Sequence, residues 1–138
     1  MIKNNRRNFV KNVAVIAAGS SLASFDTIKS TKMDAFIHHV YFWLKNPDSK
    51  EDLQALLEGL RKLSKIDYIK MFHIGKPADT NRDVIDRSYA VSWMLVFKDK
   101  AEEERYQTDP IHLNFVDTCK HLWERVKVYD SVNAWWVV

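Results

Sequence analysis

The sequence predicts an α+β fold in which a four-stranded antiparallel sheet carries two helices on one face, in the order β-α-β-β-α-β. Two segments, 36–44 and 89–97, are rich in aromatic and β-branched residues, as strands are. Two others, 48–63 and 112–126, repeat apolar residues at helical spacing. At 138 residues the chain is long enough for one such core and too short for two ordinary domains.

Residues 1–23 have the organisation of an export signal. A basic stretch precedes an apolar and small-residue run that ends at Ala23, where we expect cleavage. The run is shorter than the ~20 apolar residues that span a membrane, so no permanent anchor is expected. Arg6-Arg7 followed by Asn8-Phe9-Val10-Lys11 resembles the twin-arginine consensus, which predicts a periplasmic or secreted location. The alternative is an amphipathic helix that packs on the domain.

The first strand and the first helix follow a polar linker, 24–34, and open a domain that we expect to span 35–138. The strand over 36–44 is apolar on both faces and ends at Lys45-Asn46-Pro47. Asp48 has Glu51 three residues later, a capping-box spacing that predicts a helix start. The buried stripe of this helix is expected to be Leu53, Leu56, Leu57, Leu60 and Leu63.

The second half of the domain repeats the pattern with two more strands, a helical region and a last strand. Weak alternation over 67–77 predicts the second strand, and 89–97 predicts the third. A charged helix over 100–106 should end at Asp109-Pro110, because the residue before proline is pushed out of the helical region. The last strand is predicted over 126–132. The second long helix has a predicted apolar stripe of His112, Phe115, Val116, Cys119, Leu122, Trp123 and Val126.

Composition excludes several classes of protein. The formal charge of +3 comes from the leading segment, and residues 24–138 carry 17 basic against 18 acidic side chains, so a nucleic-acid partner is not expected. A single cysteine, Cys119, cannot form an intramolecular disulfide, and its place in the apolar stripe predicts a buried thiol. There is no glycine-rich phosphate loop, no Gly-x-Ser-x-Gly elbow and no paired-cysteine metal motif.

One face of the predicted sheet lacks a cover. Two helices cover only one side, yet the first and third strands are apolar on both sides. A protein in water seldom exposes so large an apolar surface. The simplest cover is a second copy of the chain, so we expect a homodimer formed through the sheet face.

Three groups of residues resemble the stress-responsive dimeric α/β-barrel family. They are His38 to Lys45 near the start, Tyr106 to His112 before the second helix, and His121 to Val126 with Tyr129-Asp130 near the end. The resemblance covers nearly all of 36–132 and implies a ferredoxin-like dimeric barrel. The family's Tyr-x-x-His-Pro-x-His pattern is present except that Asp109 stands at its first histidine. Many members of the family have no known activity.

The resemblance implies two functions of different classes. One is a non-catalytic exported dimer, stress-related, that binds a small apolar or aromatic ligand between helices and sheet. The other follows from similarity to plant polyketide cyclases of the olivetolic acid cyclase kind, which use a tyrosine and a histidine spaced like Tyr106 and His112, without a cofactor. Such a pair can divide the roles of base and hydrogen-bond donor. A haem- or oxygen-using monooxygenase-like role, found in neighbouring families, is a third option.

Candidate site residues follow from this reading, each with a structural alternative. His112 and Tyr106 are the catalytic candidates, although a helix-end histidine and a rim tyrosine are common structural features. His38 and His39 point to opposite faces of one strand, and His38 shares its face with Phe42. The expected ligand-binding residues are His38, Phe42, Val91, Trp93 and Phe115. No metal or other cofactor is expected, because His38, His73 and His112 lack a local ligand spacing.

Overall fold

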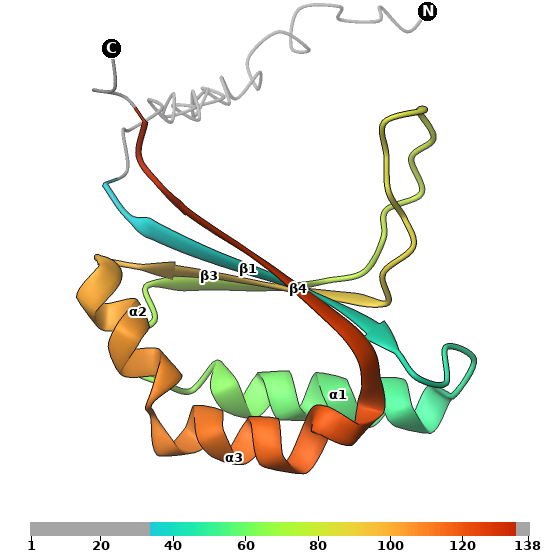
Figure 1. Ribbon diagram of the computed structural model, residues 1–138, viewed down its shortest axis with the longest axis horizontal. Helices are drawn as coiled ribbons and strands as arrows, with labels where there is room; N and C mark the ends of the chain where they lie inside the picture. Colours follow the sequence, from blue (N-terminus) through green and yellow to red (C-terminus); the bar gives the residue numbers. More distant parts are fainter. Residues whose placement is uncertain (1–33, 135–138) are drawn as a thin grey trace, which may run out of the picture. The chain divides into compact units, whose positions relative to one another are not determined.

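The structure, a computed structural model, describes residues 34–134 (Figure 1). The predicted export signal, nearly all of the predicted linker and the tail from Trp135 to Val138 lie outside these residues. Four strands and three helices make up the described part. They are β1 Phe36–Leu44, α1 Lys50–Leu63, β2 Met71–Gly75, β3 Val91–Phe97, α2 Lys100–Gln107, α3 Pro110–Cys119, the 3₁₀ turn Lys120–Leu122, and β4 Trp123–Val132.

The strands form one antiparallel sheet in the order β2-β3-β1-β4. α1 and α3 lie side by side beneath one face, with α2 at one end of the same layer, and the loop 76–90 rises on the other side of the sheet (Figure 1). The predicted fold class is therefore confirmed, with α2 and α3 as separate helices. They separate at Asp109-Pro110, as the proline predicts.

The first helix begins one residue later than predicted. Ser49, and not Asp48, is the N-cap, and its hydroxyl accepts a hydrogen bond of 3.1 Å from the backbone N–H of Asp52. Both residue types cap helices well, and Asp48 has its suitable partner Glu51 at the same spacing. The sequence pattern therefore allowed two adjacent starts.

The second strand is shorter than predicted and the third begins two residues later. Residues 66–69 form a turn in which the Ile69 N–H donates to the Ile66 carbonyl, and this turn buries Ile66 and Tyr68 before β2 begins. The apolar residues of this turn contributed to the weak alternation that predicted a longer strand. Their side chains are buried in the core, but their backbone forms a turn.

The second long helix ends earlier than predicted and β4 starts earlier. α3 stops at Cys119, the chain tightens into the 3₁₀ turn, and Trp123 is already extended and paired with Leu44. The Trp123 ring still packs on Phe42 and Phe115, with centroid distances of 5.1 and 5.8 Å. Trp123 therefore packs in the core as its helical spacing predicted, although it belongs to a strand.

The core lies between the sheet and the helices. β1 alternates between buried and half-buried side chains, and the buried set faces the helices. On β3 the side chains of Trp93, Leu95 and Phe97 are almost wholly buried on that face. Each such side chain contributes about 1.5–3 kcal/mol relative to exposure. This layer fixes β1, which carries His38 among its buried residues.

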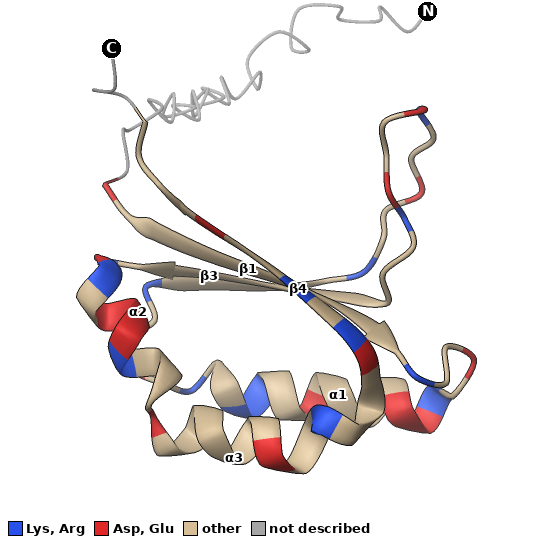
Figure 2. Cartoon of the chain, in the orientation of Figure 1, with Lys and Arg blue, Asp and Glu red and all other residues tan. Residues whose placement is uncertain are grey.

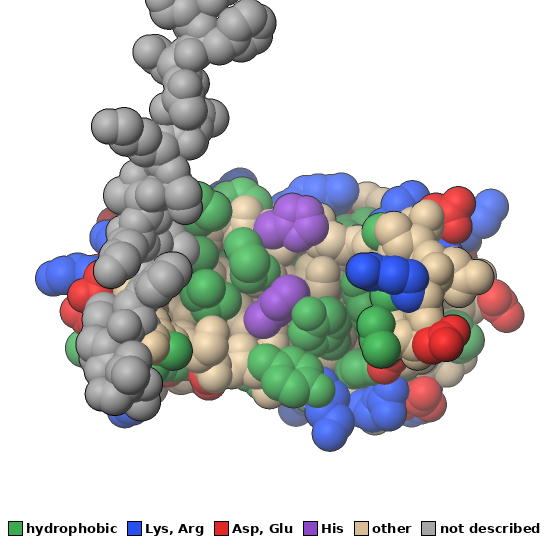
Figure 3. Space-filling model, turned by 90° about the horizontal axis from the view of Figure 1, so that it is seen from above, with side chains coloured by type: hydrophobic (Ala, Val, Ile, Leu, Met, Phe, Trp, Pro, Cys, Tyr) green, Lys and Arg blue, Asp and Glu red, His purple; other side chains and the backbone are tan. Residues whose placement is uncertain are grey.

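The other sheet face, called here the outer face, is also largely apolar. Figure 3 shows this face, with hydrophobic side chains around two histidines. β1, β2 and β3 contain no Asp, Glu, Lys or Arg, and in Figure 2 the strand charges lie on β4. Among residues 34–134, no helix is long and apolar enough to cross a membrane. The outer residues of the four strands include Ile37, His39, Tyr41, Trp43, Met71, His73, Met94, Val96 and Tyr129.

Candidate functional site

A cavity of about 580 Å³ opens between α3 and the helix-side face of β1 and β4. Most of its wall is apolar, and its polar side chains come from five elements. The apolar lining consists of Val40, Phe42, Phe115, Val116, Trp123, Val126 and Val128; the polar lining consists of His38, Glu103, Gln107, His112, Lys120 and Asp130. A mostly apolar cavity with a few polar groups is the usual form of a small-molecule site.

The most tightly organised polar group is the pair formed by His38 and Asp130. The β1–β4 register places these residues directly opposite each other, and His38 Nδ1 lies 2.7 Å from Asp130 Oδ1. A carboxylate only accepts, so Nδ1 carries the hydrogen and Nε2 is left as the acceptor or base. His38 is 5% exposed, and its fixed ring is part of the cavity wall.

Glu103 supplies a second carboxylate beside His38. Its Oε1 lies 3.8 Å from His38 Nδ1 and accepts a hydrogen bond of 2.6 Å from Gln107 Nε2. Glu103 is buried, and α2 brings it over the start of β1. Two carboxylates next to one imidazole hold the ring in a fixed orientation, as the orienting carboxylate of a catalytic triad does.

His112 lies in the first turn of α3, at the same cavity. Its Nδ1 is 3.3 Å from the Gln107 carbonyl oxygen, which can only accept, so this nitrogen donates and Nε2 is the free acceptor. Burial lowers the pKa of His112 below its usual range, and the nearby His38 lowers it further, against the opposing hydrogen bond to Gln107. The ring is therefore neutral at neutral pH.

Tyr106 supports both histidines but is not part of the cavity wall. Its ring centroid lies 4.4 Å from that of His112 and 5.9 Å from that of His38. It is 1% exposed, and its hydroxyl accepts a hydrogen bond of 3.3 Å from Trp93 Nε1. Burial strongly raises the pKa of Tyr106. Its contacts are those of a residue that positions the two rings, and the acid/base role expected for it stays a prediction.

Asp109, at the family's first histidine position, is a structural residue here. It caps α3 by accepting the Ile111 N–H at 2.8 Å, and its other oxygen accepts the Tyr68 hydroxyl at 2.9 Å. Burial, followed by this hydrogen bond, raises the pKa of Tyr68 to about 12. The substitution thus ties the start of α3 to the turn before β2, and it keeps His112 at its place.

The remaining candidate residues separate into three groups. Phe42 and Phe115 line the cavity together with His38. Val91 and Trp93, expected to bind ligand, are each 1% exposed in the core and do not line it. His73 lies on the outer face, so His38, His73 and His112 do not come together.

One set of donor atoms within residues 34–134 is close enough to suggest a metal site: those of His38, Glu103 and Asp130 lie within 4.8 Å of one another. Metal bonds of ~2.0–2.2 Å place two ligand atoms of one ion roughly 3 Å or more apart. The 2.7 Å between His38 and Asp130 is a hydrogen-bond distance. The arrangement therefore fits a proton-holding pair better than a metal site.

Sequence reasoning missed Glu103 and gave no role to Asp130. Asp130 was part of the pattern near the end of the chain, and pairing β1 with β4 would have placed it opposite His38. Glu103 lies in a helix with many charged residues, where nothing in the sequence separates this buried glutamate from the half-buried Glu102 and the exposed Glu104.

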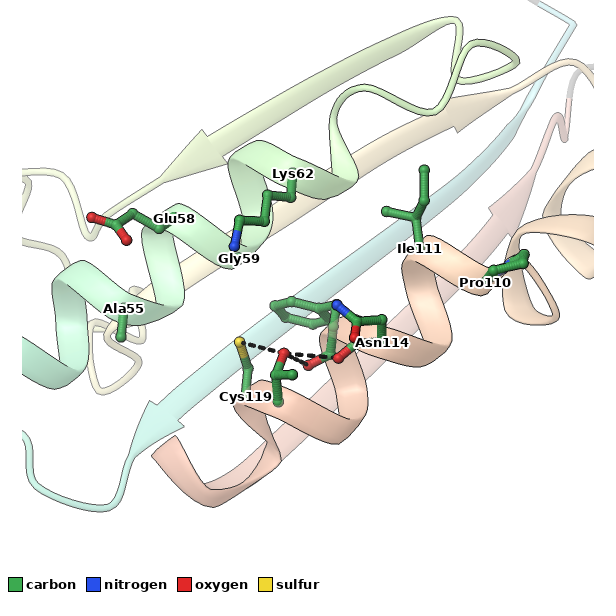
Figure 4. Close-up of a pocket in the computed structure, with 10 residues that line it drawn as sticks. Ala55, Glu58, Gly59, Lys62, Pro110, Ile111, Asn114 and Cys119 are labelled. Atoms are coloured by element: carbon green, nitrogen blue, oxygen red, sulfur yellow. Dashed lines mark hydrogen bonds between the residues drawn. The ribbon is translucent and has the colours of Figure 1, made fainter.

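A second cavity, of about 480 Å³, lies between α1 and α3 (Figure 4). The helices approach closely at Gly59, where an added Cβ would lie 2.8 Å from Phe115 and 2.9 Å from Cys119 Sγ. Its charged side chains, Glu58 and Lys62, both come from α1. No histidine lines it, so the cavity at His38 and His112 is the better candidate for chemistry.

Comparison with known proteins places this geometry in a family. Residues 36–133 match the model of the stress-responsive A/B barrel domain. A family protein with a ferredoxin-like fold from Mesorhizobium loti is 26% identical, with a TM-score of 0.59, covering 73% of this chain and 98% of its own.

Two further structures share the fold at lower identity. A hydroxynitrile lyase from Passiflora edulis is 18% identical, with a TM-score of 0.62, covering 75% of this chain and 97% of its own. A dimeric ferredoxin-like protein from Thermobifida fusca is 13% identical, with a TM-score of 0.61, covering 74% and 93%. A search among curated proteins finds no match.

Proposed function

The chain belongs to the family of the stress-responsive A/B barrel domain, and we propose that its domain is a homodimer that binds a small, mostly apolar molecule in the cavity between α3 and β4. The observation that carries this proposal is the division of the cavity wall: apolar side chains line most of it, and its titratable groups are those of His38, His112, Glu103, Asp130 and Lys120. A molecule with an apolar body and one carbonyl or hydroxyl group fits such a wall.

Binding is tested by filling the cavity. Val116 lines it, so Val116→Trp should weaken binding of a small aromatic ketone such as acetophenone at least tenfold, measured by isothermal titration calorimetry. Leu113→Trp is the matched control, because Leu113 lies on the same helix, is 55% exposed and does not line the cavity. Equal affinity in the two variants would contradict the proposed site.

A second function is cofactor-free proton transfer to and from the bound molecule. The observation that favours it is the His38–Asp130 pair, whose oriented ring offers Nε2 as a base, with the neutral His112 as a second proton acceptor. Removal of a proton next to a carbonyl by a positioned base is the first step of aldol-type cyclisation. The fold-level neighbour from Passiflora edulis is a hydroxynitrile lyase, which supports an enzymatic role for a domain of this shape.

Proton transfer is measured without knowledge of the natural substrate. The protein should catalyse deuterium exchange at the methyl group of acetophenone in D₂O, followed by NMR. His38→Gln should reduce this catalysed rate by roughly 10²-fold, the lower end of general-base contributions. His121→Gln, at an exposed histidine outside the cavity, is the control. No rate above the buffer background would leave binding as the function.

The homodimer is supported by the outer face and by the relatives. Apolar residues of all four strands lie there, and a standard interface buries ~800 Å² per partner. Several structures with this fold are described as dimeric, including those from Thermobifida fusca and Bacteroides fragilis. The sheet face is the surface that we assign to the contact.

Export by the twin-arginine route is the remaining part of the proposal. It is supported by Arg6-Arg7 and by the apolar run that follows. In a bacterial host, Arg6→Lys together with Arg7→Lys should keep the full-length chain in the cytoplasm, whereas the unchanged chain should reach the periplasm in a shortened form. Periplasmic location of the double variant would contradict this route.

A further inference from the structure

The outer face contains a histidine with an unusual environment. His39 stacks on Tyr41 with a centroid distance of 4.4 Å, and its Nδ1 lies 3.2 Å from the Tyr41 hydroxyl. Its Nε2 is the one side-chain nitrogen or oxygen of the described residues that is buried without a hydrogen-bond partner. A second histidine, His73, lies on the same face. These are features of a polar group placed in an apolar surface.

The strand register puts both histidines in one row across the sheet. Met94 of β3 pairs with His39 on one side and with His73 on the other, and Tyr129 of β4 pairs with His39 on its remaining side. The order across the outer face is therefore His73, Met94, His39 and Tyr129. Figure 3 shows the two histidines of this face surrounded by hydrophobic side chains.

The charged residues that the strand register places outward beside this row are cations. The outward residues of β4 include Arg125 and Lys127, and the Arg125 guanidinium lies 3.7 Å above the Trp43 ring. The carboxylates of Asp130 and Glu103 lie on the opposite face of the sheet, beside His38. The residues that pair outward around the histidine row therefore include no carboxylate; Glu124 lies further along β4, where the register with β1 shifts, and it shares a pocket with Trp43.

Two further kinds of titratable group complete this environment. In the loop before β3, Asp86 accepts the backbone N–H of Ser88 and lies near Arg125. Tyr41 and Tyr129 contact each other, and burial raises the pKa of Tyr41 above its usual alkaline value. The Asp86 carboxylate lines a pocket with Tyr41 and Tyr129, but the charged groups that shift the pKa of His39 are His73 and His38.

We propose that the homodimer is acid-sensitive, and that His39, assisted by His73, is the group that opens it. The inference rests on the proposed dimer through the outer face. A second copy related by a two-fold axis presents the same row, so each proton that enters the interface on one subunit is matched by one on the other. Cations in a shared apolar interface without counterions favour separation.

The direction of the pH effect follows from burial. The pKa of His39 is lowered already in the single subunit, first by burial and then by His73 and His38. Covering the face lowers the pKa further, so the dimer prefers neutral His39 and is fully favoured above the pKa of the free subunit. It is lost as the pH falls below that value. Each proton taken up on dissociation changes the dissociation constant about tenfold per pH unit, so two copies of His39 give about a hundredfold.

Analytical ultracentrifugation of the full chain between about pH 8 and about pH 5.5 tests this, with far-UV circular dichroism at each pH to show that the subunit stays folded. The unchanged chain should be dimeric at the higher pH, and its dissociation constant should rise about a hundredfold per pH unit below the pKa of His39. The His39→Gln variant should lose most of this dependence while it remains dimeric, and adding His73→Gln should remove the rest. His121→Gln, at an exposed histidine outside the row, should behave as the unchanged chain.

Three results would overturn the inference, and they are distinguishable. A dimer whose dissociation constant does not change with pH contradicts the acid sensitivity and leaves the proposed dimer intact. A pH effect that persists in the double variant places the responsible group elsewhere. A chain that is monomeric at the higher pH contradicts the proposed dimer, and the acid-sensitive interface with it.

Discussion

At the scale of single residues, the candidate chemistry depends on partners that the sequence places far apart. His38 and Asp130 are separated by 92 positions and meet because β1 and β4 pair with matching register. His112 and Tyr106 are close in sequence and in space, but the Tyr106 hydroxyl contacts Trp93 and not the cavity. The structure therefore shifts the chemical emphasis from a tyrosine and histidine pair to a histidine and aspartate pair.

Tyr106→Phe separates these two assignments. The change leaves Trp93 Nε1 buried without its partner, so the free energy of unfolding should fall by about 1–3 kcal/mol in chemical denaturation. The catalysed exchange of acetophenone should change by less than about threefold, because the hydroxyl does not reach the cavity. A loss near that of His38→Gln would instead support the tyrosine as an acid/base group.

The pH profile of exchange reports on His112. Its pKa lies below the usual 6.5 because burial disfavours the charged ring. A group whose pKa is lowered stays neutral and able to accept a proton at neutral pH. The catalysed rate should therefore be constant around neutrality and fall only at pH values below that usual pKa. In His112→Gln, measured by the same NMR assay, this fall should be weakened or absent; an unchanged profile would assign it to another group.

At the scale of elements, the sequence predicted what local spacing determines. β1 was predicted with its observed bounds, and the break at Asp109-Pro110 divides α2 from α3 as expected. The errors lie where one apolar pattern fits two backbones: Trp123 continues the helical stripe of α3 but reaches the same core from a strand. Trp123 adopts the strand conformation because it pairs with Leu44 of β1. The spacing of apolar residues along the chain does not reveal this pairing.

At the start of α1, the choice between Ser49 and Asp48 as the N-cap can be tested directly. Ser49→Ala should reduce the free energy of unfolding by about 1 kcal/mol, because the Asp52 N–H loses its acceptor. Asp48→Ala, at the position that the sequence favoured, should change it by less than about 0.5 kcal/mol. Chemical denaturation of both variants measures the free energy of unfolding. A larger loss in Asp48→Ala than in Ser49→Ala would identify Asp48 as the N-cap, as the sequence predicted.

At the scale of the whole molecule, the two faces of the sheet carry different features. Its helix side holds the core and the cavity, and its outer side holds the apolar surface that we assign to the second copy. The need for a cover on the outer face was readable from the two-sided apolar strands. A pocket between helices and sheet was also expected, but its wall on β4 was not, because that wall includes the exposed side chains Val126 and Val128.

The two sides also share one strand. His38 and His39 are neighbours on β1, yet one faces the cavity and the other faces the outer surface. The first is paired with a carboxylate and the second has a nitrogen without a partner. We therefore propose separate roles for these adjacent histidines, proton transfer for His38 and acid-sensitive assembly for His39.

The central claim is that the cavity between α3 and β4 is the ligand site, and intermolecular nuclear Overhauser effects test it most directly. With acetophenone bound to the isotope-labelled chain, we expect contacts from the ligand to the methyl groups of Val126 and Val128 and to the ring of Phe42. Contacts only to Ile37 and Val96 of the outer face, or to Ala55 between α1 and α3, would contradict the claim.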